Sequence, residues 1–241
     1  MKLNKNDVVL FSGDSITDGN RGRSMDCNHI MGHGYQFIVA SELALENAEN
    51  MPKFINKGYT GETAYDLLQK WQADVLDNKP TVLSILVGVN EGSYGYFHDM
   101  TPEQAHERYE TNLRAILELT RKELGDIRII ICEPFYCPLD RSDLSYKYMP
   151  HPDGVESPFS RPDSGDPEDS VGYREKVNAL IRATAKKIAE DYGCAFIPLY
   201  DKFYENEKRA RMEYFIWDGT HPTVAGHMII AKEWLKHTEN I

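Results

Sequence analysis

Two short segments near opposite ends of the chain carry side chains that could act together as a nucleophile and its base. The first, "FSGDSITDGNR", places Ser15 just beyond the apolar run "VVLF". The second, "FIWDGTHPTVAGH", places Asp218 three residues before His221, which a proline follows. Because a residue before proline avoids the helical conformation, we expect His221 in an extended or turn segment. These residue types fit nucleophilic catalysis, provided that the fold brings the two segments together.

Ser15, His221 and Asp218 have the chemistry of a catalytic triad. Serine is a poor nucleophile until a base removes its proton, and a histidine oriented by a carboxylate is a common base. We expect Asp218 to bind one ring nitrogen of His221, which leaves the other to deprotonate Ser15. Proton transfer by such a histidine raises the reaction rate by ~10²–10⁴-fold. An Asp-x-x-His pair alone is more often a surface capping pair, but a serine at the end of the first predicted strand favours the triad.

Acyl transfer also needs hydrogen-bond donors for the tetrahedral oxyanion, and two segments offer them. "NKGYTGET" contains Gly61, whose backbone N–H has no side chain in front of it. "LVGVNEGSYG" contains Asn90, whose side-chain amide is a donor. Each segment follows an apolar run, and each alone is equally a turn, because Gly and Asn favour turns. The order of all four segments along the chain strengthens the catalytic interpretation.

The elements that would position these residues alternate along the chain. Short apolar runs predict buried strands at 7–13, 53–58, 81–88, 127–135 and 194–199. Amphipathic periodicity predicts helices at 34–47, 61–76, 101–124, 172–192 and 222–237. This alternation indicates an α/β fold with a parallel sheet covered by helices on both faces. In such folds, sites form at the carboxyl ends of the strands, where the four segments lie.

The stretches "GDSITD", "NKGYTGET", "VGVN" and "DGTHP" resemble the four blocks of the SGNH, or GDSL, esterase family. The resemblance assigns catalysis to Ser15, His221 and Asp218. It assigns the oxyanion hole to the N–H groups of Ser15 and Gly61 and the side chain of Asn90. It implies a flavodoxin-like, three-layer α/β/α sandwich with a central five-stranded parallel sheet. Further stretches, among them "GHGYQFIV" and "KWQADVL", are similar to the small intracellular branch with carbohydrate acetylesterases, including acetylxylan esterases.

One position departs from the family pattern. The third block usually ends Gly-x-Asn-Asp, whereas this chain has Glu91 in the last place. The donor Asn90 is retained, but the neighbouring carboxylate is one methylene longer. We therefore expect the hydrogen bonding beside Asn90 to differ from the family's usual arrangement.

Three further side chains are candidates for substrate contact. Arg21 and Arg23 follow the nucleophile closely, and Trp217 immediately precedes Asp218. A tryptophan there could stack on a sugar face or an acyl group, and it could equally be a core residue. The segment "CNHIMGH" (27–33) lacks the tightly spaced additional ligands of a zinc site, so no metal is expected. The resemblance implies no cofactor either.

The composition limits the setting of this chemistry. The length of 241 residues fits one domain spanning 1–241, with an irregular, proline-rich insertion at about 139–171 that is either a lid or disordered. The net charge of −11 argues against nucleic acid and anionic membranes as partners. We find no signal peptide and no CxxC pairing among the four cysteines, which predicts a cytoplasmic protein with reduced thiols.

The predicted function is a serine esterase that removes acetyl groups from the hydroxyls of small acetylated oligosaccharides through an acetyl-enzyme. One alternative is a thioesterase or lysophospholipase with a longer acyl pocket. The other is a catalytically silent carbohydrate-binding protein, which the intact set of three catalytic residues disfavours. By analogy with related acetylesterases, we also expect self-association into a homo-oligomer.

Overall fold

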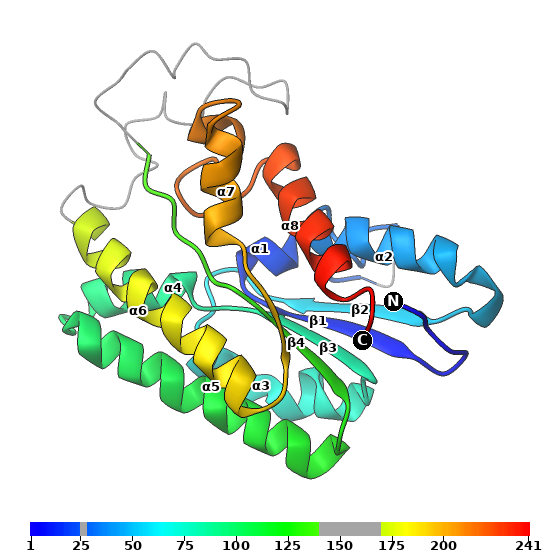
Figure 1. The fold of residues 1–241 in the computed structure, drawn as a ribbon. Coiled ribbons are helices and arrows are strands. Elements are labelled where there is room, and N and C mark those ends of the chain that lie inside the picture. The colour runs from blue at the N-terminus through cyan, green and yellow to red at the C-terminus, as the bar shows by residue number, and fades with distance from the viewer. Residues whose placement is uncertain (25–27, 140–169) are drawn as a thin grey trace.

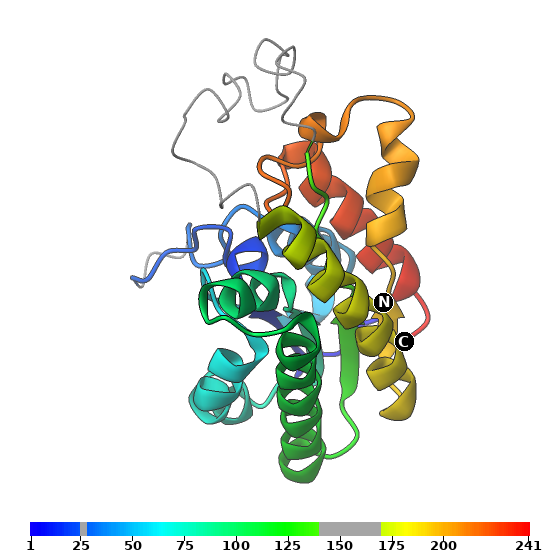
Figure 2. The same ribbon diagram turned by 90° about the vertical axis from the view of Figure 1, so that its left-hand side faces the viewer.

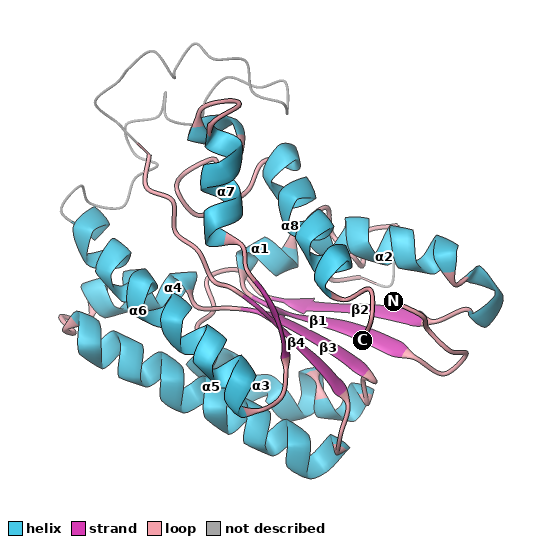
Figure 3. Cartoon of the chain, viewed as in Figure 1, coloured by secondary structure: helices cyan, strands magenta, loops and turns pink. Residues whose placement is uncertain are grey.

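Five parallel strands form one sheet in the order β2-β1-β3-β4-β5 (Figure 3). The computed structural model describes residues 1–24, 28–139 and 170–241. The strands are β1 (Val8–Gly13), β2 (Lys53–Gly58), β3 (Val82–Leu86), β4 (Arg128–Cys132) and β5 (Ala195–Ile197). Each lies within an apolar run predicted as a strand, so the five-stranded parallel sheet is confirmed.

Helices cover both faces of the sheet, which confirms the three-layer sandwich (Figures 1 and 2). Apolar residues of α2 and α8 pack on one face, and those of α3, α5 and α6 pack on the other. Strand β1 shows why both faces are apolar: Val9 and Phe11 join the first cluster, while Leu10 joins the second. The helices are α1 (Ser15–Asp18), α2 (Tyr35–Glu46), α3 (Ala64–Asp74), α4 (Val89–Phe97), α5 (Pro102–Leu124), α6 (Ser170–Asp191), α7 (Tyr200–Glu207) and α8 (Val224–His237).

Sequence reasoning found the five long helices and missed three short ones, α1, α4 and α7. Helix α5 begins as its sequence indicates: Thr101 and Gln104 form a reciprocal capping box, with Pro102 in the first turn. The segment after the third strand, for which a turn was one of two interpretations, is the start of α4. That helix holds two glycines and three aromatic residues, which have low helix propensity, so packing rather than local preference forms it.

The predicted insertion at 139–171 falls almost wholly on residues 140–169, outside the described part of the chain. Its last two positions, 170 and 171, are the first residues of α6. The three cysteines that the structure describes, Cys132, Cys137 and Cys194, are free thiols. Among the described helices, we find none whose length and apolarity would let it cross a membrane.

A histidine of α8 joins that helix to α2. The first backbone N–H of α2, from Tyr35, donates to Nδ1 of His227 over 3.1 Å. This N–H has no partner inside its own helix, so the imidazole acts as a cap. Accepting at Nδ1 requires the neutral ring, and burial together with the nearby His221 and His33 lowers the pKa of His227 to about 4.

We predict that His227 makes the free energy of unfolding of the wild type decrease more, as the pH falls from 6.5 towards 4, than that of a variant without a titrating group at this position. In that range the unfolded chain binds a proton at His227 that the folded chain excludes, so the stabilisation present above pH 6.5 is lost, by about 3 kcal/mol at most. Denaturant unfolding of the wild type and of His227→Asn at pH 7, 6 and 5 measures this effect. Asparagine carries an acceptor oxygen at the position of Nδ1 but does not titrate. Identical pH dependence in both proteins would contradict the prediction.

Candidate active site

Ser15 is the first residue of α1 and lies two positions after the end of β1. The preceding Asp14 is the N-cap of that short helix, and its carboxylate accepts the N–H of Ile16 at 3.0 Å. Asp14 is fully buried, and burial raises its pKa to about 7. A strand followed at once by a capped helical turn places Ser15 at the carboxyl edge of the sheet.

The structure joins the predicted triad into one chain of hydrogen bonds. The hydroxyl Oγ of Ser15 lies 2.8 Å from Nε2 of His221, across 206 positions of sequence. Nδ1 of the same ring lies 2.6 Å from Oδ2 of Asp218. With the proton on Nδ1, the ring donates to the carboxylate, and Nε2 is left to accept the Ser15 proton. Both contacts that the sequence predicted, Ser15 with His221 and His221 with Asp218, are present.

The Asp218 carboxylate is held in place by the backbone that follows it. Its Oδ1 accepts the N–H groups of Thr220 and His221 at 2.9 and 2.8 Å, while Oδ2 faces the imidazole. Burial opposes ionisation of Asp218, but these donors outweigh burial and lower its pKa. The carboxylate is therefore charged at neutral pH and cannot rotate away from the ring.

The electrostatic setting of His221 favours a basic imidazole. Burial disfavours the imidazolium, but the hydrogen bond and charge of Asp218 outweigh burial and raise the pKa of His221. The charge of the nearby Asp14 acts in the same direction, and the Arg174 guanidinium acts against it.

Arg174 is a site residue that sequence reasoning missed. It lies on α6, is buried, and donates from Nη2 to Oγ1 of Thr220 at 2.9 Å. Its guanidinium also stacks 4.2 Å above the ring of Tyr136. The sequence did carry a signal, because Arg174 shares the apolar face of its helix with Val177 and Ile181. A buried arginine on such a face indicates a partner inside the protein.

The predicted oxyanion donors lie on either side of the nucleophile because of the strand order. In the sheet, β1 lies between β2 and β3, and Gly13 is aligned with both Gly58 and Leu86. Ser15 follows β1, the turn with Gly61 follows β2, and Asn90 in the first turn of α4 follows β3. Parallel strands that end together therefore bring the three blocks to one edge of the sheet.

The predicted donor of Gly61 is a backbone N–H, whereas that of Asn90 is a side-chain amide held by a hydrogen bond. Gly61 has a φ of +82°, a conformation that glycine adopts without strain, and a Cβ there would meet nothing within 4 Å. Within the part of the chain that the structure describes, no acceptor faces the N–H of Ser15 or of Gly61. The Asn90 amide donates from Nδ2 to the backbone oxygen of Glu62 at 3.0 Å, which fixes its direction and leaves its second N–H available.

The three candidates for substrate contact have different surroundings. Arg23 is exposed, but its guanidinium forms a two-pronged ion pair with the buried Asp18. Arg21 donates from Nε to the backbone oxygen of Gly58 at 3.0 Å, and its guanidinium stacks 4.7 Å above the Tyr59 ring. Trp217 is half-buried, and its backbone N–H donates to the backbone oxygen of His221 at 2.7 Å. Arg21 and Trp217 thus lie next to the blocks that carry Gly61 and His221.

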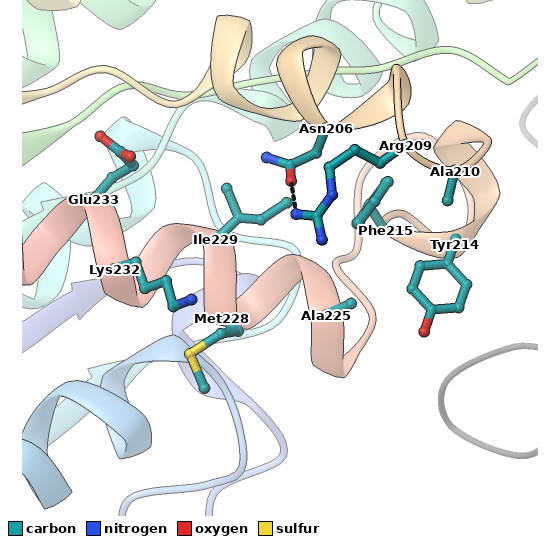
Figure 4. A pocket seen from close by; sticks show the side chains of 10 residues that line it. All are labelled: Asn206, Arg209, Ala210, Tyr214, Phe215, Ala225, Met228, Ile229, Lys232 and Glu233. Carbon is teal, nitrogen blue, oxygen red and sulfur yellow. Dashed lines mark hydrogen bonds between the residues drawn. The ribbon is translucent and has the colours of Figure 1, made fainter.

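Two other features bear on the choice of site. Among the described residues, no group of three His, Cys, Asp or Glu side chains could hold a metal ion. A groove of about 610 Å³ lies between α7 and α8, and Figure 4 shows its side chains. Arg209 on one wall and Lys232 on the other flank the apolar Phe215 and Ile229. No residue of the predicted triad or oxyanion hole is among the residues that line this groove.

The sequence profile of the GDSL-like lipase/acylhydrolase family matches residues 11–229. The chain belongs to this family. The matched span contains every block from which the site is built, from Ser15 to His221. Membership also agrees with the five-stranded parallel sheet that the structure shows.

Known relatives extend over almost the whole chain. An acetylxylan esterase from Geobacillus stearothermophilus is 29% identical over 240 residues, which cover 98% of this chain and 95% of that enzyme. A solved structure of a variant of that esterase has a TM-score of 0.75 at 28% identity, covering 98% and 96% of the two chains. A structure from Parabacteroides merdae, named for its likeness to GDSL lipases, has a TM-score of 0.78 at 30% identity, covering 99% and 98%. The chain is a carboxylic ester hydrolase.

We predict that Asp218→Asn lowers the pKa of His221, because it removes the charge that raises this pKa. NMR titration of protein labelled at the imidazole carbons measures the change directly. Asp126→Asn is a suitable control, since Asp126 is fully exposed and lies just before β4, at the opposite edge of the sheet. An unchanged or higher pKa of His221 in Asp218→Asn would show that the carboxylate does not govern the ring.

Proposed function

We propose that this ester hydrolase removes acetyl groups from carbohydrate hydroxyls, with Ser15 as nucleophile, His221 as base and Asp218 as the orienting carboxylate. One observation carries the proposal: the unbroken hydrogen-bond chain from Ser15 Oγ through the imidazole to Asp218. A surface capping pair would not place Nε2 2.8 Å from a serine hydroxyl on the first strand's edge. This geometry supports nucleophilic catalysis.

The mechanism follows from the positions of these groups. His221 Nε2 takes the Ser15 proton as Oγ attacks the ester carbonyl, and Asp218 stabilises the imidazolium that results. The N–H groups of Ser15 and Gly61 and the Asn90 amide hold the oxyanion, each donor contributing roughly 3–4 kcal/mol. The imidazolium then protonates the departing sugar oxygen. Water, deprotonated by the same histidine, hydrolyses the acetyl-enzyme and restores Ser15.

Relatives support both the residues and the acyl group. Solved variants of the Geobacillus stearothermophilus acetylxylan esterase include catalytic mutants with alanine in place of a serine, an aspartate and a histidine. In that enzyme the aspartate and histidine are three positions apart, as Asp218 and His221 are here. A tryptophan directly precedes that aspartate, in the place of Trp217. We therefore include Trp217 and Arg21 in the proposal as contacts for the sugar.

The proposed partner is a small acetylated saccharide. The net charge of −11 does not favour nucleic acid or an anionic membrane surface. The buried free thiols Cys132 and Cys137 suit a reducing compartment, so the cytoplasm and short imported oligosaccharides belong to the same proposal. Assembly into a homo-oligomer remains an expectation from related acetylesterases.

We predict that the protein hydrolyses p-nitrophenyl acetate faster than the butyrate or octanoate, and that it deacetylates acetylated xylooligosaccharides. Ser15→Ala should lower kcat by about 10⁴-fold or more, since the nucleophile is removed. Ser41→Ala is the matched control, because Ser41 is an exposed serine on α2 whose hydroxyl donates only to its own helix. The assays are release of p-nitrophenol and of acetate.

Each result has a definite meaning. A preference for octanoate would replace the acetylesterase proposal with the thioesterase or lysophospholipase alternative. Hydrolysis of p-nitrophenyl acetate without activity on any acetylated sugar would leave the proposed triad in place and reject the proposed carbohydrate substrate. Wild-type rates in Ser15→Ala would reject the triad itself.

A further inference from the structure

Two adjacent residues of α4 join that helix to the turn before α3. The Asn90 amide donates to the backbone oxygen of Glu62 at 3.0 Å, and the carboxylate Oε1 of Glu91 accepts the N–H of Ala64 at 2.9 Å. Gly61 immediately precedes the segment that makes both contacts. These two hydrogen bonds therefore determine where the Asn90 side chain lies relative to the Gly61 N–H.

The second oxygen of Glu91 is held from a third helix. Arg108 of α5 donates from Nη1 to Oε2 of Glu91 at 2.5 Å. The guanidinium lies 4.1 Å from the ring centroid of Tyr94 on α4 and 5.0 Å from that of Tyr65 on α3. Arg108 thus packs against one tyrosine from each helix that its partner Glu91 connects, and its own position is restricted.

The burial of this pair points to a role other than stability. The Glu91 side chain is 0% exposed and that of Arg108 is 14% exposed. Desolvation offsets much of the attraction within a buried ion pair, so such pairs are weak sources of folding stability. Burial raises the pKa of Glu91 to about 7 even with Arg108 beside it, which shows that the site disfavours the charge it holds. What the pair does provide is a fixed geometry.

We infer that Glu91, held by Arg108, is a positioning residue that sets the separation of the two oxyanion donors, the Gly61 N–H and the Asn90 amide. The inference rests on the proposed roles of Gly61 and Asn90. It also gives a physical meaning to the departure from the family pattern. Aspartate is shorter by one methylene, about 1.5 Å, and could not reach both Ala64 and Arg108 from the same backbone position.

Substitution of this pair tests the inference through the chemical step. We expect Glu91→Asp and Glu91→Gln to lower kcat for p-nitrophenyl acetate by about 10- to 100-fold, because removing a whole oxyanion donor costs about 10²–10³. KM should change by less than about threefold, since a misplaced oxyanion donor weakens the transition state more than the bound ester. Affinity for a boronic acid that mimics the tetrahedral state should fall with kcat. Labelling with a fluorophosphonate measures the concentration of active sites. The value of kcat is calculated per active site, so unfolded protein does not lower it.

Thr120→Val is the matched control. The Trp71 indole on α3 donates to the Thr120 hydroxyl on α5 at 2.8 Å, so this buried contact joins the same two helices without touching α4. We expect Thr120→Val to lower the melting temperature and to leave kcat per active site unchanged. If the Glu91 variants do not fold, Arg108→Lys replaces them, because lysine keeps the charge but places the donor elsewhere. We expect Arg108→Lys to lower kcat per active site in the same way.

The inference is overturned if both Glu91 variants keep kcat within about twofold of the wild type per active site. It is also overturned if Thr120→Val lowers kcat as much as the Glu91 variants do when the melting temperatures of these variants fall equally. The loss of kcat would then follow from general destabilisation of the fold. Failure of the substrate proposal looks different: the wild type would hydrolyse p-nitrophenyl acetate but no acetylated sugar, and the effect of Glu91 would remain. If Ser15→Ala keeps the wild-type rate, the proposed site and this inference fail together.

Discussion

The arrangement of the site depends on one constraint, the alignment of three parallel strand ends. Gly13, Gly58 and Leu86 are in register, so the chain leaves the sheet at one level on β1, β2 and β3. The close approach of the first two connections requires glycine, because a Cβ on Gly58 would lie 2.2 Å from the backbone nitrogen of Asp18. Because β1 lies between β2 and β3, a residue that follows β1 is flanked by the residues that follow β2 and β3. The blocks are far apart in sequence and adjacent in space for this reason.

Polar groups at this edge of the sheet are held by several partners each. Asp18 accepts from Arg23 and from both the N–H and the hydroxyl of Thr60, which joins the first block to the second. Asp218 accepts from two backbone N–H groups as well as the imidazole. Because each carboxylate is fully engaged, the side chains that meet substrate are restricted in advance, which favours a preorganised site.

The sequence allowed the sheet, the long helices and the contacts among Ser15, His221 and Asp218 to be predicted, because these follow from local patterns: apolar runs, helical periodicity and short motifs. It did not allow α4 to be predicted, since its glycines and aromatic residues carry little helix propensity and its packing on α5 and α6 decides the structure. The role of Glu91 depends on contacts to α3 and α5, 27 and 17 positions away in sequence. Arg174 reaches Thr220 across 46 positions. Such contacts become visible only when the helices are placed.

The segment from Ile216 to Pro222, which carries Asp218 and His221, forms a closed unit of its own. The bridge between Ile216 and Pro222 and the hydrogen bond from Trp217 to His221 close a short hairpin, inside which Asp218 already orients the imidazole. Asp218 and His221 therefore lie within one closed segment of seven consecutive residues. The orientation of the imidazole is set locally, by contacts that form within this hairpin, together with the contact from Arg174 to Thr220. The distance from Nε2 to Ser15 Oγ depends instead on how the hairpin packs against the sheet, so a change in the core would move the imidazole as a whole relative to Ser15 and leave its orientation by Asp218 intact.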